Sequence, residues 1–205
     1  MKRSFIFMIA VVMALVAMTI LAYAAKNELS HQDKSFLEDA AKGNMLEMQL
    51  GQLASTQSSN PDIQKMGKNL TKDHSAVNQQ LGAIAQQNAA TLPMELGYEQ
   101  KHKVDSLAKK SGSDFDRTFL DDVLKAHKNS IDIYQKEANN GKDLALRSLA
   151  SQTLPKLREH QSMAQQMQTA AKSTMPGEAG TSGMQPSGSS SGSGMGTSGM
   201  GTSRY

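Results

Sequence analysis

The sequence of 205 residues contains no cysteine and no tryptophan. The absence of cysteine excludes disulfide bonds, and it excludes anchoring to a membrane through a lipid on an N-terminal cysteine. It also excludes thiolate metal ligands and cysteine nucleophiles. A metal site in this chain would therefore have to use imidazole, carboxylate or thioether groups.

The sequence also lacks a strong excess of charge of either sign. Its formal net charge is +3 at pH 7, with 22 Lys and Arg residues against 19 Asp and Glu residues. Without Lys2 and Arg3 the balance is 22 − 2 = 20 basic against 19 acidic residues, a net charge of +1. No stripe rich in Lys or Arg is present, so we do not expect a nucleic-acid partner.

Motifs that mark common active sites are missing as well. The chain has no Gly-x-Ser-x-Gly, no phosphate-binding glycine loop and no His-Glu-x-x-His. The usual di-iron bundle carries two Glu-x-x-His motifs. Here the residues three positions before the histidines at 74, 127 and 160 are Thr71, Leu124 and Leu157. We therefore lean against an enzyme, and an activity that uses a bound metal has little support.

The N-terminal 24 residues are typical of a signal peptide. Lys2 and Arg3 precede an apolar run from Phe5 to Leu21, and Ala22-Tyr23-Ala24 fits a small-x-small cleavage site. This pattern predicts cleavage after Ala24 and export, to the periplasm or to an association with the outer membrane. The alternative is a retained membrane anchor, because the apolar run is long for a signal peptide.

The C-terminal segment 173–205 differs in composition from the rest of the chain. It consists mostly of Gly, Ser, Thr, Met and Pro, and Gly194–Ser198 is repeated as Gly199–Ser203. Such a segment buries too little apolar surface to offset chain entropy, so we expect a disordered tail. Its methionines could serve as thioether ligands for Cu(I), although a plain linker is favoured; they are Met175, Met184, Met195 and Met200.

The remaining residues, 30–172, predict one all-α domain. Apolar residues recur at steps of three and four over 33–57, 61–87, 114–139 and 143–171, the pattern of amphipathic helices. Asp33 is a candidate N-cap for the first helix, and Asn60-Pro61 is typical of a helix start. Pro155 lies inside the fourth helix and is expected to kink it.

The connection between the second and third long helices is unusually long. It spans 88–113 and contains a predicted short helix at 99–110. Short loops join antiparallel neighbours, whereas a long crossover lets two successive helices run parallel, as in ferritin-like folds. We therefore predict a ferritin-like four-helix bundle with a long crossover between helices 2 and 3.

Each of the four long helices carries one metal-competent polar residue within its apolar stripe. These residues are Glu47, His74, His127 and His160. Burying such groups is costly unless they have partners. At a rise of about 1.5 Å per residue, the crossover topology places all four within about 4.5 Å in height, against roughly 7.5 Å in an up-down bundle. The pattern therefore predicts one shared cluster near the middle of the bundle.

A cluster of one carboxylate and three imidazoles could bind one transition-metal ion. Such ligands suit zinc, copper, iron, nickel or manganese without deciding among them. The set could close a tetrahedral site or leave an open position for water. Asp73 and Glu159, each next to a cluster histidine, are candidate outer partners. The other histidines, His31 and His102, are expected at the surface.

A competing interpretation needs no metal. A buried Glu–His network could fix the register of the helices by hydrogen bonding alone. Gly43 and Gly51 stand four residues on either side of Glu47, and glycine inside a helix costs about 1 kcal/mol relative to alanine. They indicate that a ligand or a neighbouring helix needs room there, and the sequence leaves both open.

Several ordered segments resemble the bacterial domain-of-unknown-function 4142 family over about 33–168. They are Phe36–Glu47 with Leu50-Gly51, Asp73-His74-Ser75, Phe115-Asp116-Arg117, His127, and Thr153–His160. The resemblance implies an exported, ferritin-like helical bundle of the outer membrane or periplasm, and it implies no established activity. The matching positions include all four cluster residues, whereas the Gly/Ser/Met tail is not part of the family pattern.

Two classes of function follow. The first is an exported metal-binding bundle in metal handling or envelope stress. The second is a structural or partner-binding envelope bundle, in contact with an envelope protein or a membrane, whose Glu/His network is architectural. The metal, the partner and the oligomeric state are left open by the sequence.

Overall fold

The structure is a computed structural model, which describes Met13 and residues 29–174. The described residues form five helices and no strand. The helices are α2 (His31–Gln57), α3 (Pro61–Gln87), α4 (Tyr98–Ala108), α5 (Gly112–Asn140) and α6 (Leu144–Thr174). The predicted signal peptide, apart from Met13, and the tail beyond Thr174 with its methionines lie outside the described residues. No helix among the described residues is both long enough and apolar enough to cross a membrane.

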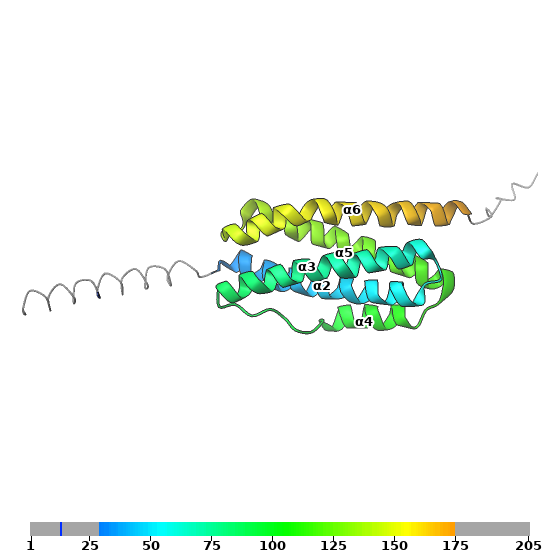
Figure 1. Ribbon diagram of the computed structural model, residues 1–205, viewed down its shortest axis with the longest axis horizontal. Coiled ribbons are helices and arrows are strands. Elements are labelled where there is room, and N and C mark those ends of the chain that lie inside the picture. Colours follow the sequence, from blue (N-terminus) through cyan, green and yellow to red (C-terminus); the bar gives the residue numbers. More distant parts are fainter. Residues whose placement is uncertain (1–12, 14–28, 175–205) are drawn as a thin grey trace, which may run out of the picture. The chain divides into compact units, whose positions relative to one another are not determined.

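The four long helices are arranged as two antiparallel pairs, α2 with α3 and α5 with α6 (Figure 1). The connection after α3 returns along the bundle and includes α4, so that α5 starts at the end where α3 started. As a result α3 and α5 run in the same direction, and so do α2 and α6. This arrangement confirms the predicted all-α, ferritin-like bundle with a long crossover between its second and third long helices.

The N-cap residues of α2 and α3 were both predicted from the sequence, and one of the two predictions holds. Helix α3 has the predicted bounds, and the side chain of Asn60 accepts a hydrogen bond from the backbone N–H of Asp62 at 2.9 Å. The prediction of Asp33 as the N-cap of α2 was wrong, because Ser30 has this role. Ser30 Oγ accepts from the Asp33 N–H at 3.2 Å, and Asp33 Oδ2 accepts from the Ser30 N–H at 2.9 Å. Asp33 is therefore the N3 residue of a capping box, the third residue of the helix.

Helices α2, α4, α5 and α6 have boundaries that differ from the predicted ones by one to three residues. Helix α5 begins at Gly112, two residues before the predicted start, with Ser111 as N-cap. Gly112 has a φ of +57°, in the left-handed region that favours glycine, so the turn into α5 falls there. Helix α6 continues through Pro155 and reaches Thr174.

The hydrophobic core consists of two clusters separated along the bundle axis. One lies at the end where α2 and α6 begin and includes Phe36, Leu81, Tyr134 and Leu146. The other lies at the opposite end and includes Leu50, Leu70, Phe119, Val123 and Ala164. On α3, α5 and α6 the predicted cluster histidine falls between the stretches that build these two clusters, and on α2 Glu47 directly follows Leu46 of the second cluster. The core is therefore divided by a polar layer that has apolar side chains on both sides.

The contact between α2 and α3 depends on two glycines that face each other. A Cβ atom placed on Gly51 would lie 2.5 Å from the backbone oxygen of Gly67 and 2.7 Å from Thr71 Oγ1. Gly51 therefore makes room for a neighbouring helix. Gly43 has no such constraint, because a Cβ atom there would meet only Ser130 Oγ, at 3.6 Å.

We predict that Gly51→Ala lowers the free energy of unfolding by about 1–3 kcal/mol, because α2 and α3 must move apart to admit the methyl group. Gly82→Ala on α3 is the matched control, since a Cβ atom there meets nothing within 4 Å. It should raise stability by roughly 0.4–1 kcal/mol. Urea denaturation followed by circular dichroism measures both, and equal effects of the two substitutions would contradict the packing argument.

A group of polar contacts, separate from the polar layer, joins the start of α2 to the turn between α5 and α6. Asp33 Oδ1 accepts hydrogen bonds from the backbone N–H groups of Lys142 at 2.8 Å and Asp143 at 3.2 Å. Glu137, also buried, accepts from Gln32 Nε2 at 3.0 Å. Burial, followed by the neighbouring Asp33, raises the pKa of the Glu137 carboxyl to about 7. Burial opposes ionisation of Asp33 too, but its hydrogen bonds with Ser30, Asp143 and Lys142 bring its pKa below the usual value.

We predict that Glu137 makes the protein less stable as the pH rises through about 7. A raised folded-state pKa favours the folded protein below the unfolded-state value, and this contribution is lost above the folded-state value. The Glu137→Gln variant has no ionisable group at this position. Between pH 5 and pH 8.5 its free energy of unfolding should rise by about 1–3 kcal/mol relative to that of the parent. Unfolding titrations across this range test the prediction, and a constant difference between the two proteins would contradict it.

Candidate metal centre

Three of the four predicted cluster residues meet in the polar layer. His74 lies on α3, His127 on α5 and His160 on α6, and all three are buried. Their ring centroids form a nearly equilateral triangle, with separations of 5.5 Å, 5.7 Å and 5.4 Å. One nitrogen from each ring lies within 4.8 Å of one nitrogen from each of the others. The sequence-predicted convergence of these histidines is thus present in the fold.

One nitrogen of each ring faces a hydrogen-bond acceptor. His74 Nδ1 lies 2.9 Å from Asn44 Oδ1, and His160 Nε2 lies 3.1 Å from Asp73 Oδ2. A neutral imidazole carries its proton on one nitrogen and a lone pair on the other. These acceptors therefore place the proton on Nδ1 of His74 and on Nε2 of His160.

The Nδ1 atom of His127 lies close to two oxygen atoms. Its Nδ1 lies 3.0 Å from the Val123 carbonyl oxygen, one turn earlier on α5, and 2.9 Å from Glu47 Oε1 on α2. The geometry directs the N–H at the Val123 carbonyl, and neither oxygen of Glu47 receives a hydrogen bond among the described residues. Glu47 is therefore a fully buried carboxylate in contact with one ring of the cluster.

The remaining nitrogen of each ring has no hydrogen-bond partner among the described residues. These atoms are His74 Nε2, His127 Nε2 and His160 Nδ1, and all of them are buried. A buried polar atom without a partner costs about 1–3 kcal/mol. Three such atoms, each from a ring oriented through its other nitrogen, form a set of lone pairs suited to a metal ion. The residues of the cluster therefore fit a metal ion.

Burial and mutual repulsion keep two of the rings neutral. Burial, followed by the nearby His127 and His160, holds the pKa of His74 well below its usual value. Burial and then His127 also lower the pKa of His160, although the contact with Asp73 partly offsets this. A metal ligand must be deprotonated. His74 and His160 therefore meet the protonation requirement at neutral pH.

His127 differs from the other two rings. Burial lowers its pKa, but the charge and proximity of Glu47 and the hydrogen bond to Val123 outweigh burial, so that the pKa of His127 lies above its usual value. His127 is therefore the ring of the three that most readily carries a positive charge in the absence of metal.

The outer contacts differ in part from the predicted ones. Asp73, predicted as an outer partner, does contact a cluster ring, but the ring is that of His160 on α6 and not that of its sequence neighbour His74, because Asp73 lies off the centre of the α3 stripe. Glu159 is exposed and pairs with Lys156 at 2.8 Å, away from the rings. Asn44 was missed, although it stands one turn before Glu47 on the same helix face. His31 and His102 are exposed, as predicted.

The fold and the polar layer define a ferritin-like helical bundle with a buried histidine cluster. The family model described as "Domain of unknown function (DUF4142)" matches residues 19–167. The chain therefore belongs to this family, as its sequence segments had indicated. A comparison with curated proteins gives no match.

Three solved structures share the fold at low sequence identity. A DUF305 fragment from Deinococcus radiodurans is similar with a TM-score of 0.63 and 11% identity, over 70% of this chain and 99% of that one. CopM in its Cu(II)-bound form has a TM-score of 0.59 and 16% identity, over 67% and 96%. The dodecameric thioferritin of Bacteroides fragilis, a bacterioferritin-related protein, has a TM-score of 0.54 and 17% identity, over 70% and 90%.

We predict that Asn44→Leu destabilises the metal-free protein by about 1–3 kcal/mol. The substitution removes the partner of His74 Nδ1, and this nitrogen is then buried without a hydrogen bond whether or not it carries the proton. Asn129→Leu, the same change at an exposed position of α5, is the control and should stay within about 0.5 kcal/mol of the parent. Urea denaturation in the presence of a chelator measures both. Equal stability of the two variants would show that Asn44 does not hold the ring.

Proposed function

We propose that this protein binds one transition-metal ion through His74, His127 and His160. Two observations carry the proposal: one nitrogen of each ring lies within 4.8 Å of one nitrogen of each of the other rings, and each ring has one buried nitrogen without a hydrogen-bond partner among the described residues. A network that served only to fix the helix register would be expected to pair these nitrogens with donors. The cluster instead leaves one nitrogen of each ring buried without such a partner among the described residues.

The spacing of the nitrogens is compatible with a single ion. Nitrogen ligands bind zinc at about 2.0–2.1 Å, so two ligands of one ion are at most about 4.2 Å apart. One nitrogen from each ring lies within 4.8 Å of one nitrogen from each of the others, and shifts of a fraction of an ångström bring such a set into range. Imidazole suits zinc, copper, iron, nickel and manganese. The Cu(II)-bound form of the similarly folded CopM supports copper as the first metal to test.

Glu47 completes the proposed site as a carboxylate beside His127. Its Oε1 contacts Nδ1, whereas the lone pair proposed for the metal is on Nε2. The charge of a carboxylate in this place raises the pKa of His127 and so increases the basicity of the ring. The sequence predicts Glu47 as a direct metal ligand. The two roles of Glu47 lead to different expected effects of the Glu47→Gln substitution, which are given below.

The cellular part of the proposal rests on the N-terminal segment. A signal peptide cleaved after Ala24 would deliver the bundle to the periplasm, in keeping with a role in metal handling or envelope stress. The N-terminal residue of the exported protein tests this part: Ala25 supports it, and Met1 contradicts it.

We predict that the full-length protein, purified without a histidine tag, takes up about one equivalent of one metal after incubation with zinc, copper, iron, nickel or manganese. Plasma mass spectrometry after desalting measures the stoichiometry. His74→Ala and His127→Ala should each abolish this uptake, because each removes one of three ligands. The exposed histidines provide matched controls, and His31→Ala and His102→Ala should bind as the parent does.

The same experiment assigns Glu47. As an outer partner, Glu47→Gln should weaken binding about 10–100-fold while stoichiometry is retained at saturating metal. A complete loss, as in His127→Ala, would make Glu47 a direct ligand. Circular dichroism must show a folded helical protein for each variant. No uptake of any metal by the parent would overturn the proposal in favour of an architectural network.

A further inference from the structure

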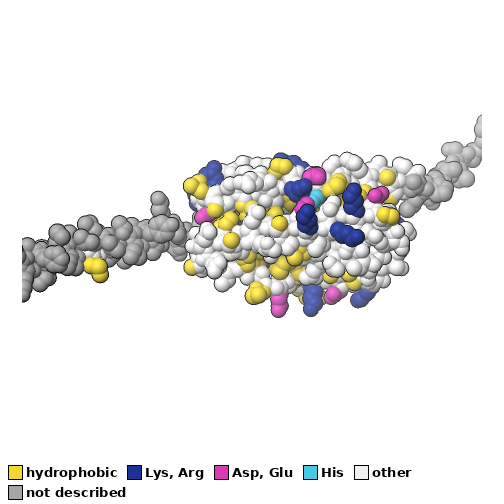
Figure 2. Space-filling model, viewed as in Figure 1, with side chains coloured by type: hydrophobic (Ala, Val, Ile, Leu, Met, Phe, Trp, Pro, Cys, Tyr) yellow, Lys and Arg dark blue, Asp and Glu magenta, His cyan; other side chains and the backbone are white. Residues whose placement is uncertain are grey.

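A pocket between α3 and α6 leads from the surface to the histidine cluster. It has a volume of about 250 Å³, and both His74 and His160 line it. The other lining residues include Asp73, Ala76 and Lys156. On the face that carries α3 and α6, histidine atoms are visible among acidic and basic side chains (Figure 2). The cluster is therefore closest to solvent on this side.

The opposite side of the cluster is closed. His127 on α5 and Glu47 on α2 have no exposed surface, and neither lines this pocket. The two apolar clusters close the layer along the bundle axis. An ion that approached from α2 or α5 would have to separate packed helices, whereas an approach between α3 and α6 requires only movement of the side chains that line the pocket.

Asp73 is the outer acceptor that solvent reaches. Its side chain is 29% exposed, whereas Asn44 and Glu47, the side-chain partners of the other two rings, are 3% and 0% exposed. Asp73 therefore borders the pocket and touches His160 at the same time. A carboxylate in this place can bind a cation before the imidazoles do.

A lysine stands beside this carboxylate. Lys156 Nζ lies 4.0 Å from Asp73 Oδ2 and 2.8 Å from Glu159 Oε2. The ammonium group therefore occupies the place where an incoming cation would meet Asp73, and it has a second carboxylate with which it can stay paired.

We propose that the metal ion enters and leaves through the pocket between α3 and α6, that Asp73 binds the ion first, and that Lys156 competes with the ion for Asp73. The inference rests on the proposed function, because it assigns a route to that same site. The ligand class is a hydrated divalent transition-metal cation.

A tryptophan at the pocket mouth tests the route. Ala76 is exposed and lines the pocket, whereas Ala83 is exposed, lies two turns further along α3 and does not line it. With the full-length protein and the metal that binds it, Ala76→Trp should slow both association and extraction by a chelator about tenfold, with the dissociation constant unchanged. Ala83→Trp should match the parent. Stopped-flow absorbance with Co(II) or Cu(II), and a chromophoric chelator for Zn(II), measures the rates.

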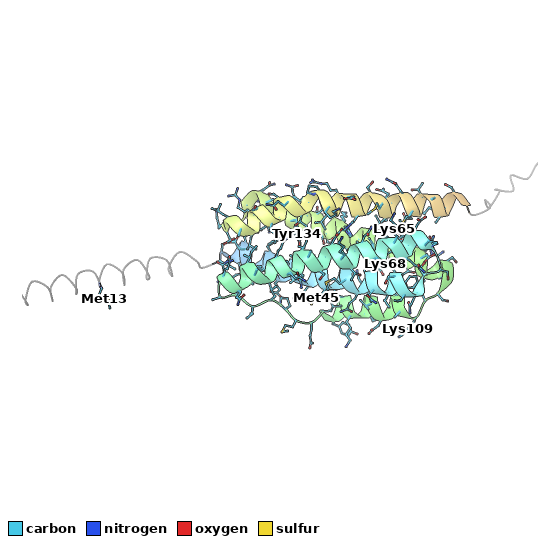
Figure 3. The ribbon with its side chains drawn as sticks, in the orientation of Figure 1. Met13, Met45, Lys65, Lys68, Lys109 and Tyr134 are labelled. Carbon is cyan, nitrogen blue, oxygen red and sulfur yellow. The ribbon has the colours of Figure 1, made fainter. Side chains whose placement is uncertain are left out.

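Charge substitutions test the roles of Asp73 and Lys156. Asp73→Asn can still accept the His160 N–H, and it should slow association about tenfold, since the first contact loses its charge. Asp132→Asn, the same change at an exposed position of α5, should not slow it. Lys156→Gln should speed association. Lys68→Gln, on an exposed residue of α3 outside the pocket (Figure 3), is its control.

The outcomes separate this inference from the proposed function. Metal uptake with parental rates in Ala76→Trp would overturn the route while the metal site stands. If Asp73→Asn accelerates dissociation with association unchanged, Asp73 only orients His160 and is not the first contact. No metal uptake by the parent would overturn both the route and the proposed function.

Discussion

The contact of each cluster histidine with its acceptor is the interaction on which the rest of the site depends. Asn44, the Val123 carbonyl with Glu47, and Asp73 each engage one ring nitrogen. Each contact orients a ring and leaves the other nitrogen with a lone pair. Without these contacts the rings could turn, and buried imidazoles would add only a cost to folding. The acceptors come from three helices, so the orientation of the rings requires the assembled bundle.

The two apolar clusters determine the properties of this polar layer. They lie on either side of it along the bundle axis and keep water away from the rings. In such surroundings charges are poorly solvated, which explains why burial dominates the lowered pKa values of His74 and His160. The same surroundings strengthen the influence of Glu47 on His127. One layer thus contains two neutral rings and one ring that favours a proton, although all three are histidines.

The bundle is not equally tight on all sides. Helices α2 and α3 meet through backbone contacts at Gly51 and Gly67, which bring them close together. Between α3 and α6, in contrast, a pocket reaches the two rings that these helices carry. Close packing on one side of the histidine cluster keeps the positions of the rings defined. The pocket on the other side gives solvent and ions access to two of these rings. Membership of a family without an assigned function gives no activity, so the functional argument rests on this local arrangement.

The sequence by itself determined the long helices, the crossover and the three histidines and Glu47 of the polar layer. Helical periodicity and the lengths of connections are local properties, and they predicted the parallel course of α3 and α5 and the convergence of the three histidines. The tertiary structure alone decided the partners of each ring. Asp73 contacts His160 on another helix instead of serving the adjacent His74, and Asn44 belongs to the site although its sequence context is unremarkable. Such pairings depend on how each helix is rotated and how far it lies from its neighbours. Periodicity predicts which face of a helix is buried, but it does not predict the exact rotation or the separation.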